Sequence, residues 1–174
     1  MADEMTRSAV FSPERLYRYS LTRRWADGPI MNVIGLNPST ADETTDDPTI
    51  RRCIALARRN GYGALIMTNL FAFRATSPTE MKQALEPIGI DNDPAIYAAT
   101  QYASGMVVAA WGTQGAHVNR GRRVLELLRY TADVYPLWCL GVTRDGHPKH
   151  PLYLPNTANP IRYEAMGTAY ADGD

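Results

Sequence analysis

Four short apolar segments, separated by stretches with helical periodicity, constrain the fold of this chain more than any other feature. They span residues 30–36 (IMNVIGL), 64–69 (ALIMTN), 106–112 (MVVAAWG) and 134–141 (VYPLWCLG). Strands that are apolar along their whole length are typical of a parallel sheet covered by helices on both faces. We therefore predict an α/β fold with three layers, α/β/α, around a central four-stranded parallel sheet. An N-terminal strand or hairpin over residues 17–25 is expected beside it.

The segments between these strands carry signals for helix ends. Asp47 is a candidate N-cap, Pro48 stands at the first helical position, and Gly61 ends the helical pattern. Ser77 and Glu80 form a second start signal, a capping box. Two further helices are expected over residues 93–103 and 116–130.

The length and composition fit one globular domain. The chain has 174 residues, of which 45% are hydrophobic and 21% charged, which is enough for a full core. We expect a single domain over residues 1–174, with its core at about residues 30–155 and a frayed tail at 165–174. No apolar run approaches the roughly 20 residues that span a bilayer, and the N-terminus does not read as a secretory signal. We therefore expect a cytoplasmic monomer without a membrane partner.

The cysteines and histidines do not form a metal-binding pattern. Cys53 and Cys139 are far apart in the chain and are expected to be buried free thiols. His147 and His150 each precede a proline in one loop, but Asp145 is the only carboxylate close to them in sequence. We therefore predict no metal and no cofactor.

Polar residues end the predicted strands, at the edge where open parallel sheets bind ligands. Asn37 follows the first strand, and Asn69 ends the second. Asn37 is either a turn residue or a group that holds a water molecule, because an amide both donates and accepts hydrogen bonds. Asn69 is either a loop cap or a reader of the edge of a planar heterocycle.

The charged residues are unevenly distributed, although the net charge is zero. Of the 18 basic residues, 16 are arginine, whose planar fork of donors suits phosphate. Four of them, Arg51, Arg52, Arg58 and Arg59, share one side of the predicted helix 47–61. This side is either an ordinary solvated surface or a surface that binds a phosphate backbone.

Acidic residues crowd the loop that follows the first strand. They are Asp42, Glu43, Asp46 and Asp47. Apart from Asp47 as a helix cap, and with Asp42 as the main candidate for another role, we expect this cluster to be solvated.

In their order along the chain, four of these segments resemble motifs of the uracil-DNA glycosylase superfamily. They are GLNPS (35–39), MTNLFAFRA (67–75), VVAAWGTQGA (107–116) and HPKHPL (147–152). The superfamily has a first loop G-x-D/N-P, a second strand ending in Asn, a third ending in W-G or a similar pair, and a late H-P-S-P-L-type loop. The segments RYSLTRRW, LNPSTAD, DDPTIRRC, NLFAFRATSP and GHPKHPLYL are more similar still to the bacterial and phage domain of unknown function 1643.

The resemblance to the glycosylases implies roles for individual residues. Asn37 would orient the attacking water, and Asn69 would bond to the flipped base. His150, or alternatively His147, would stabilise negative charge on the departing base. The further base-binding residues would be Leu36, Ser39 and Phe71, and the phosphate contacts would be Arg51, Arg52, Arg58, Arg59 and Lys149.

The function implied is that of a metal-independent, DNA glycosylase-like hydrolase. It would cleave the N-glycosidic bond of a damaged or modified pyrimidine base in single- or double-stranded DNA. Ser39 and Thr40 stand where uracil-selective members have a Tyr, so a bulkier base than uracil would fit. Two alternatives are a non-catalytic module that binds a nucleobase or nucleic acid, and an enzyme acting on free modified nucleosides.

Overall fold

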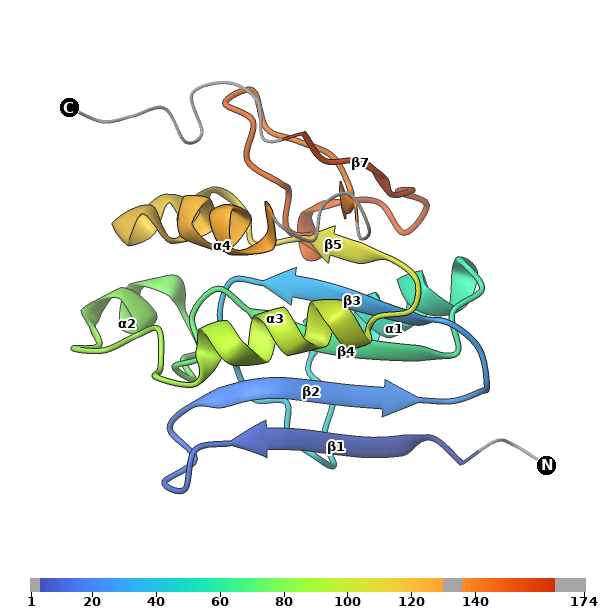
Figure 1. The fold of residues 1–174 in the computed structure, drawn as a ribbon, viewed down its shortest axis with the longest axis horizontal. Helices are drawn as coiled ribbons and strands as arrows, with labels where there is room; N and C mark the ends of the chain where they lie inside the picture. The colour runs from blue at the N-terminus through green and yellow to red at the C-terminus, as the bar shows by residue number, and fades with distance from the viewer. Residues whose placement is uncertain (1–3, 130–135, 165–174) are drawn as a thin grey trace.

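The structure is a computed structural model that describes residues 4–129 and 136–164 (Figure 1). The strands are β1 (Thr6–Phe11), β2 (Arg18–Arg24), β3 (Ile30–Gly35), β4 (Ala64–Asn69), β5 (Val107–Ala109), β6 (Leu137–Cys139) and β7 (Ile161–Arg162). The α-helices are α1 (Pro48–Arg59), α2 (Pro78–Gln83), α3 (Asn92–Tyr102) and α4 (Arg120–Leu128), with 3₁₀ segments η1 (Thr113–Asn119) and η3 (Pro151–Tyr153). The predicted frayed tail, residue 130 of the fourth predicted helix, and residues 134 and 135 of the fourth predicted strand lie outside the described residues.

The described residues form one seven-stranded mixed sheet in the order β1-β2-β4-β3-β5-β6-β7. Strands β4, β3, β5 and β6 run parallel, whereas β1–β2, β2–β4 and β6–β7 pair antiparallel. The α/β class is confirmed, and the N-terminal strand or hairpin expected over residues 17–25 corresponds to β2, which pairs with β1. The sheet is larger than the four strands predicted, because it also includes the edge strands β1 and β7. These two strands are mostly exposed, so their sequences contain no apolar run of the kind that predicts a buried strand.

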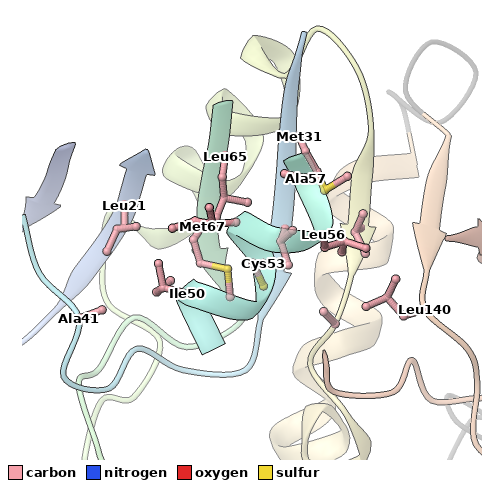
Figure 2. Close-up of a cluster of buried hydrophobic side chains, with 14 of the residues drawn as sticks. Leu21, Met31, Ala41, Ile50, Cys53, Leu56, Ala57, Leu65, Met67 and Leu140 are labelled. Atoms are coloured by element: carbon pink, nitrogen blue, oxygen red, sulfur yellow. The ribbon is translucent and has the colours of Figure 1, made fainter. Parts of the chain in front are cut away.

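Helices cover both faces of the sheet (Figure 1). On one face, α1 packs its buried side against β3 and β4, as Figure 2 shows for Ile50 and Cys53 near Met67 and for Ala57 near Met31. The second core cluster contains residues of α3 and α4 together with β3, β5 and β6. None of the helices in the described ranges combines the length and apolar character that crossing a bilayer requires.

Both cysteines are buried free thiols, as predicted. Cys53 lies on the core side of α1, and Cys139 ends β6. Burial raises the pKa of Cys53 to about 12, and it also raises the pKa of Cys139. Both thiols therefore stay protonated at neutral pH and are poor nucleophiles.

Most of the predicted helix ends are confirmed. The Asp47 side chain accepts a hydrogen bond of 2.9 Å from the Ile50 amide and caps α1. Ser77 caps α2 in the same way, through the Glu80 amide at 3.2 Å. The predicted helix 116–130 is wrong at its start, because Val118 and Asn119 have φ angles of 46° and 58°. These left-handed residues end η1, and α4 begins only at Arg120.

Two buried arginines of β2 hold the loop over residues 36–47 against the sheet. Arg23 pairs with Asp46 at 2.8 Å and donates a bond of 2.5 Å to the Asp42 carbonyl oxygen. Arg18 donates a bond of 2.8 Å to the carbonyl oxygen of Ala41. The expectation that Asp46 is solvated is wrong, because its side chain is only 12% exposed and also pairs with Arg7. The loop is therefore anchored at several points.

Candidate functional site

A cavity of about 440 Å³ lies beyond the carboxyl ends of the parallel strands β3 and β5. Its walls come from the loop after β3, the segment after β5, the start of α1 and the loop around η3. Small-molecule sites in proteins have roughly this size. A recess of about 40 Å³ adjoins it. The recess and the cavity share six lining residues, which are Leu36, Asn37, Ser39, Asp47, Thr49 and His150.

Several residues predicted from the sequence come together here. Asn37, Ser39, Leu36 and His150 line both the cavity and the recess, and Asn69 lines the recess. These residues come from three segments of the chain that the sheet brings to one edge. The polar residues at the ends of the predicted strands therefore do lie together at one edge of the sheet.

The Asn37 side chain has a defined orientation. Its amide nitrogen donates one hydrogen bond of 3.1 Å to the Pro38 carbonyl oxygen and another of 2.9 Å to that of Ala75. Because both amide hydrogens are used, the remaining polar atom is the acceptor Oδ1. Asn37 therefore offers a fixed acceptor at the boundary between the cavity and the recess.

Asn69 lies deeper and is almost completely buried, with 2% of its surface exposed. Its Oδ1 accepts a bond of 3.4 Å from the guanidinium of Arg18, a residue that also lines the recess. Gly35 lies beside its amide, and a methyl group added there would come within 2.7 Å of Nδ2. Because Gly35 has no side chain, it leaves room for the Asn69 amide in this position.

His150 presents one ring nitrogen as an acceptor and the other as a donor. Its Nδ1 accepts a hydrogen bond of 3.2 Å from the Leu152 amide, so the neutral ring carries its proton on Nε2. Desolvation by burial lowers the pKa of His150 below its usual value, and the charge of Asp47 opposes this shift. At neutral pH His150 is therefore an uncharged ring with an N–H to donate.

The structure separates the two loop histidines that the sequence left as alternatives. His150 lines the cavity, whereas His147 lines neither the cavity nor the recess and is 8% exposed. Phe71 also lies elsewhere, since it is fully buried in the core with its ring 5.7 Å from that of His117. Lys149 is half-buried and lines neither hollow.

The sequence did not indicate two of the residues that line the site. Asp47 was assigned only to capping α1, yet it is the one acidic residue in the lining of the cavity and the recess among the described residues. Arg18 was read only as part of an N-terminal strand. A charged residue inside a strand pattern was the available signal, but only the fold shows that its side chain is buried. Within the described residues no group of three or more His, Cys, Asp or Glu could hold a metal ion.

A second hollow, of about 530 Å³, runs between α1 and the segment that follows His150. We call it the arginine groove, because Arg51, Arg52 and Arg59 line it and no acidic residue does in the described chain. Their guanidinium groups donate to the backbone carbonyl oxygens of Asp46, Leu154 and Ala158, respectively. Among the described residues, none of these three positive charges is paired with a carboxylate.

The arginine groove adjoins the cavity, since Pro48 and Leu152 line both. The fourth arginine of the predicted stripe, Arg58, does not line the groove and instead lies 4.9 Å from the centre of the Trp25 ring. The structure therefore divides the stripe, with three arginines in the groove and one stacked on an aromatic ring.

In a comparison with known families, the model of a family described as a protein of unknown function, DUF1643, matches residues 18–152. The chain belongs to the DUF1643 family. The matched part of this DUF1643 chain begins at Arg18 and ends at Leu152, so it contains Asn37, Asn69 and His150. Searches of curated proteins and of solved structures found no match. The predicted membership of this family is confirmed, and its description assigns no activity.

Proposed function

We propose that this DUF1643 chain is a glycosylase-like hydrolase that cleaves the N-glycosidic bond of a base in DNA. The observation that carries the proposal is the shared lining of one cavity and its recess by Asn37, Asn69 and His150. Each of these residues offers a group that the reaction needs, in an orientation set by a hydrogen bond. The cavity is also large enough for a base.

The chemistry of base release matches these groups. Breaking an N-glycosidic bond leaves positive charge on the sugar and negative charge on the base. The Oδ1 atom of Asn37 would accept a hydrogen bond from the attacking water and hold it near the sugar. The water oxygen would bond to the sugar carbon as the glycosidic bond breaks, and the proton that the water loses would end on the departing base. The carboxylate of Asp47 would stabilise the positive sugar, and the Nε2–H of His150 would donate to the departing base.

A base in DNA reaches such a cavity only when it leaves the stack, which costs a few kcal/mol. Two exposed apolar side chains stand at the rim, with Leu152 46% and Tyr153 86% exposed. They suit contact with the bases beside an extruded nucleotide. The adjoining arginine groove would bind the phosphates on one side of it.

The direct test is an assay on oligonucleotides that each contain one uracil, mismatched, deaminated or 5-modified base, as single and double strands. We expect one class of base to be released, leaving an abasic site that alkali cleaves. The Asn37→Ala variant should lose about 10²-fold or more in rate. Its melting temperature, measured in parallel, is expected to stay close to that of the unmodified protein and so to show that the variant is folded.

Three outcomes would separate this proposal from its alternatives. No product from any base, together with tight binding to DNA, would favour a binding module. Release from free nucleosides, without affinity for DNA, would favour a nucleoside hydrolase. A loss of activity that follows a loss of folding in Asn37→Ala would remove the assigned role of that residue.

The arginine groove gives a separate prediction about affinity. The triple variant Arg51→Gln/Arg52→Gln/Arg59→Gln should bind DNA with a weaker dependence on salt. The slope of log affinity against log salt is negative, and its magnitude should fall by about 2–3, because each phosphate contact contributes about 0.7–0.9. The measurement is fluorescence anisotropy of a labelled strand over a range of salt concentrations. A control variant, Arg24→Gln/Arg123→Gln/Arg144→Gln, removes the same charge from residues that do not line the groove. Equal slopes for the two triple variants would contradict a phosphate path through the groove.

A further inference from the structure

We infer that Arg18 and Asn69 make the recess selective for a hydrogen-bond acceptor, so that the bound base presents a carbonyl oxygen there and not an amino group. The inference rests on the proposed function, because it takes the ligand of the cavity to be a base. It adds which exocyclic group of the base enters the recess, which the sequence did not indicate.

Arg18 has more hydrogen-bond donors than the described chain satisfies. Its side chain is 2% exposed, and no acidic residue of the described chain lies within ion-pair distance of it. It donates to the carbonyl oxygen of Ala41 and to Oδ1 of Asn69, and its Nε–H has no acceptor among the described residues. A buried cation without a counter-charge is costly, so an acceptor supplied by a ligand would offset part of this cost.

The charge of Arg18 is retained at neutral pH. Burial lowers its pKa to about 10, although the nearby charge of Asp47 raises it. The recess therefore has a cationic donor in its lining under ordinary conditions.

Arg18 also determines the orientation of the Asn69 amide. A guanidinium group has only donors, so the atom of Asn69 that faces it must be the oxygen. The amide NH₂ then lies on the other branch, beside Gly35. Arg18 and Asn69 are thus two donors in the part of the recess that the cavity does not share.

The remaining lining of that inner part contains no competing acceptor side chain. It consists of Gly35, Ile50 and Met67. Asp47 and the Asn37 amide oxygen belong to the wall that the recess shares with the cavity. A ligand atom that enters the inner part therefore meets donors.

The size of the recess limits what can enter it. Its volume of about 40 Å³ is about one tenth of the 440 Å³ of the cavity, so only a small group can enter it. It holds a single exocyclic group while the ring occupies the larger cavity. An oxygen there would accept from the two donors, whereas an amino group would place N–H against N–H. Bases with a carbonyl at this edge, as in uracil, fit, and bases with an amino group there, as in cytosine, do not.

The test compares short single strands that carry one deoxyuridine, one deoxycytidine or one tetrahydrofuran abasic analogue. The Asn37→Ala background slows cleavage during the binding measurement. We expect the deoxyuridine strand to bind at least about tenfold more tightly than the deoxycytidine strand, because a hydrogen bond to a charged group is worth about that much. Arg18→Met should reduce this preference to under about twofold, with the affinity of each protein for the abasic strand taken as its own reference.

Each outcome has a distinct meaning. If deoxycytidine binds as tightly as deoxyuridine or more tightly in the parent protein, and both bind more tightly than the abasic strand, the inference is overturned while the base-binding cavity stands. This comparison does not depend on the folding of Arg18→Met. A preference for deoxyuridine that persists in folded Arg18→Met also overturns it. If the three strands bind equally in the parent protein, no base enters the cavity, and the proposed function fails with the inference.

Discussion

The His150→Ala variant is expected to release the base about 10²–10³ times more slowly than the unmodified protein, which is the usual cost of removing one donor aimed at a developing negative charge. His150 lines the cavity, and its Nδ1 is occupied by the Leu152 amide. The proton on Nε2 is therefore already in position before the reaction begins. The measurement is a single-turnover rate on the best substrate of the oligonucleotide panel.

The matched control for this prediction is His147→Ala. The two histidines are in the same loop, and each precedes a proline, but only His150 lines the cavity. We expect His147→Ala to keep most of the chemical rate in the fraction that is folded, which its melting curve reports. Equal losses in the two variants would contradict the assignment of His150 as the donor.

The titration of His150 checks its environment without any substrate. Its pKa should lie below the ordinary value of about 6.5, because burial disfavours the charged ring. Asp47→Asn should lower this pKa further, since the Asp47 charge raises it, while Asn preserves the cap of α1. Both pKa values are measurable by NMR of the imidazole protons.

The depressed pKa of His150 also sets the sign of its effect on stability. The unfolded chain takes up the proton first as the pH falls below about 6.5. The contribution of His150 to stability is therefore complete above that pH and decreases below it. If the pKa of His150 were the same in Asp47→Asn, the Asp47 carboxylate would not interact with the His150 ring as inferred.

Asp46→Ala is expected to lower the free energy of unfolding by about 3–5 kcal/mol, the usual cost of leaving a buried charge without its partner. Arg23 has no exposed surface, and its Nε lies 2.8 Å from the Asp46 carboxylate. A loss of that size would lower the melting temperature by roughly 6–20 °C in a domain of this length. Thermal and urea unfolding would measure it.

Glu43→Ala in the same loop is the control. Glu43 pairs with Arg15 at 2.7 Å, but the two side chains are 42% and 47% exposed. An exposed pair of this kind contributes about 1 kcal/mol or less. If Asp46→Ala were as mild as Glu43→Ala, Arg23 would not depend on Asp46, and the anchoring of the loop would need another explanation. Adding Arg23→Met to Asp46→Ala should restore part of the lost stability, because it removes the unpaired charge.

Local signals in the chain predicted much of this fold. Fully apolar segments identified β3, β4 and β5, and the Asp47-Pro48 pair identified the start of α1. Signals of this kind work because strand burial and helix capping depend on residues close together in sequence. The edge strands β1 and β7 escaped for the same reason, since their exposed residues leave no such local pattern.

The residues of the candidate site were predicted less completely. Strand ends pointed to Asn37 and Asn69, because the carboxyl ends of parallel strands share one edge of the sheet. The resemblance placed His150 first but left His147 as an alternative, and nothing in the pattern revealed that Arg18 lines the recess. These facts depend on how loops from distant parts of the chain pack against one another.

By itself, then, the sequence determined the α/β class, the family, and the edge of the sheet at which polar residues gather. Only the tertiary structure decided which of those residues share a cavity, and that Asp47 and Arg18 join them. The physical reason is that a buried charge or a fixed amide requires partners from several segments at once. Such a set of contacts exists only when the chain is folded, so no single stretch of residues encodes it.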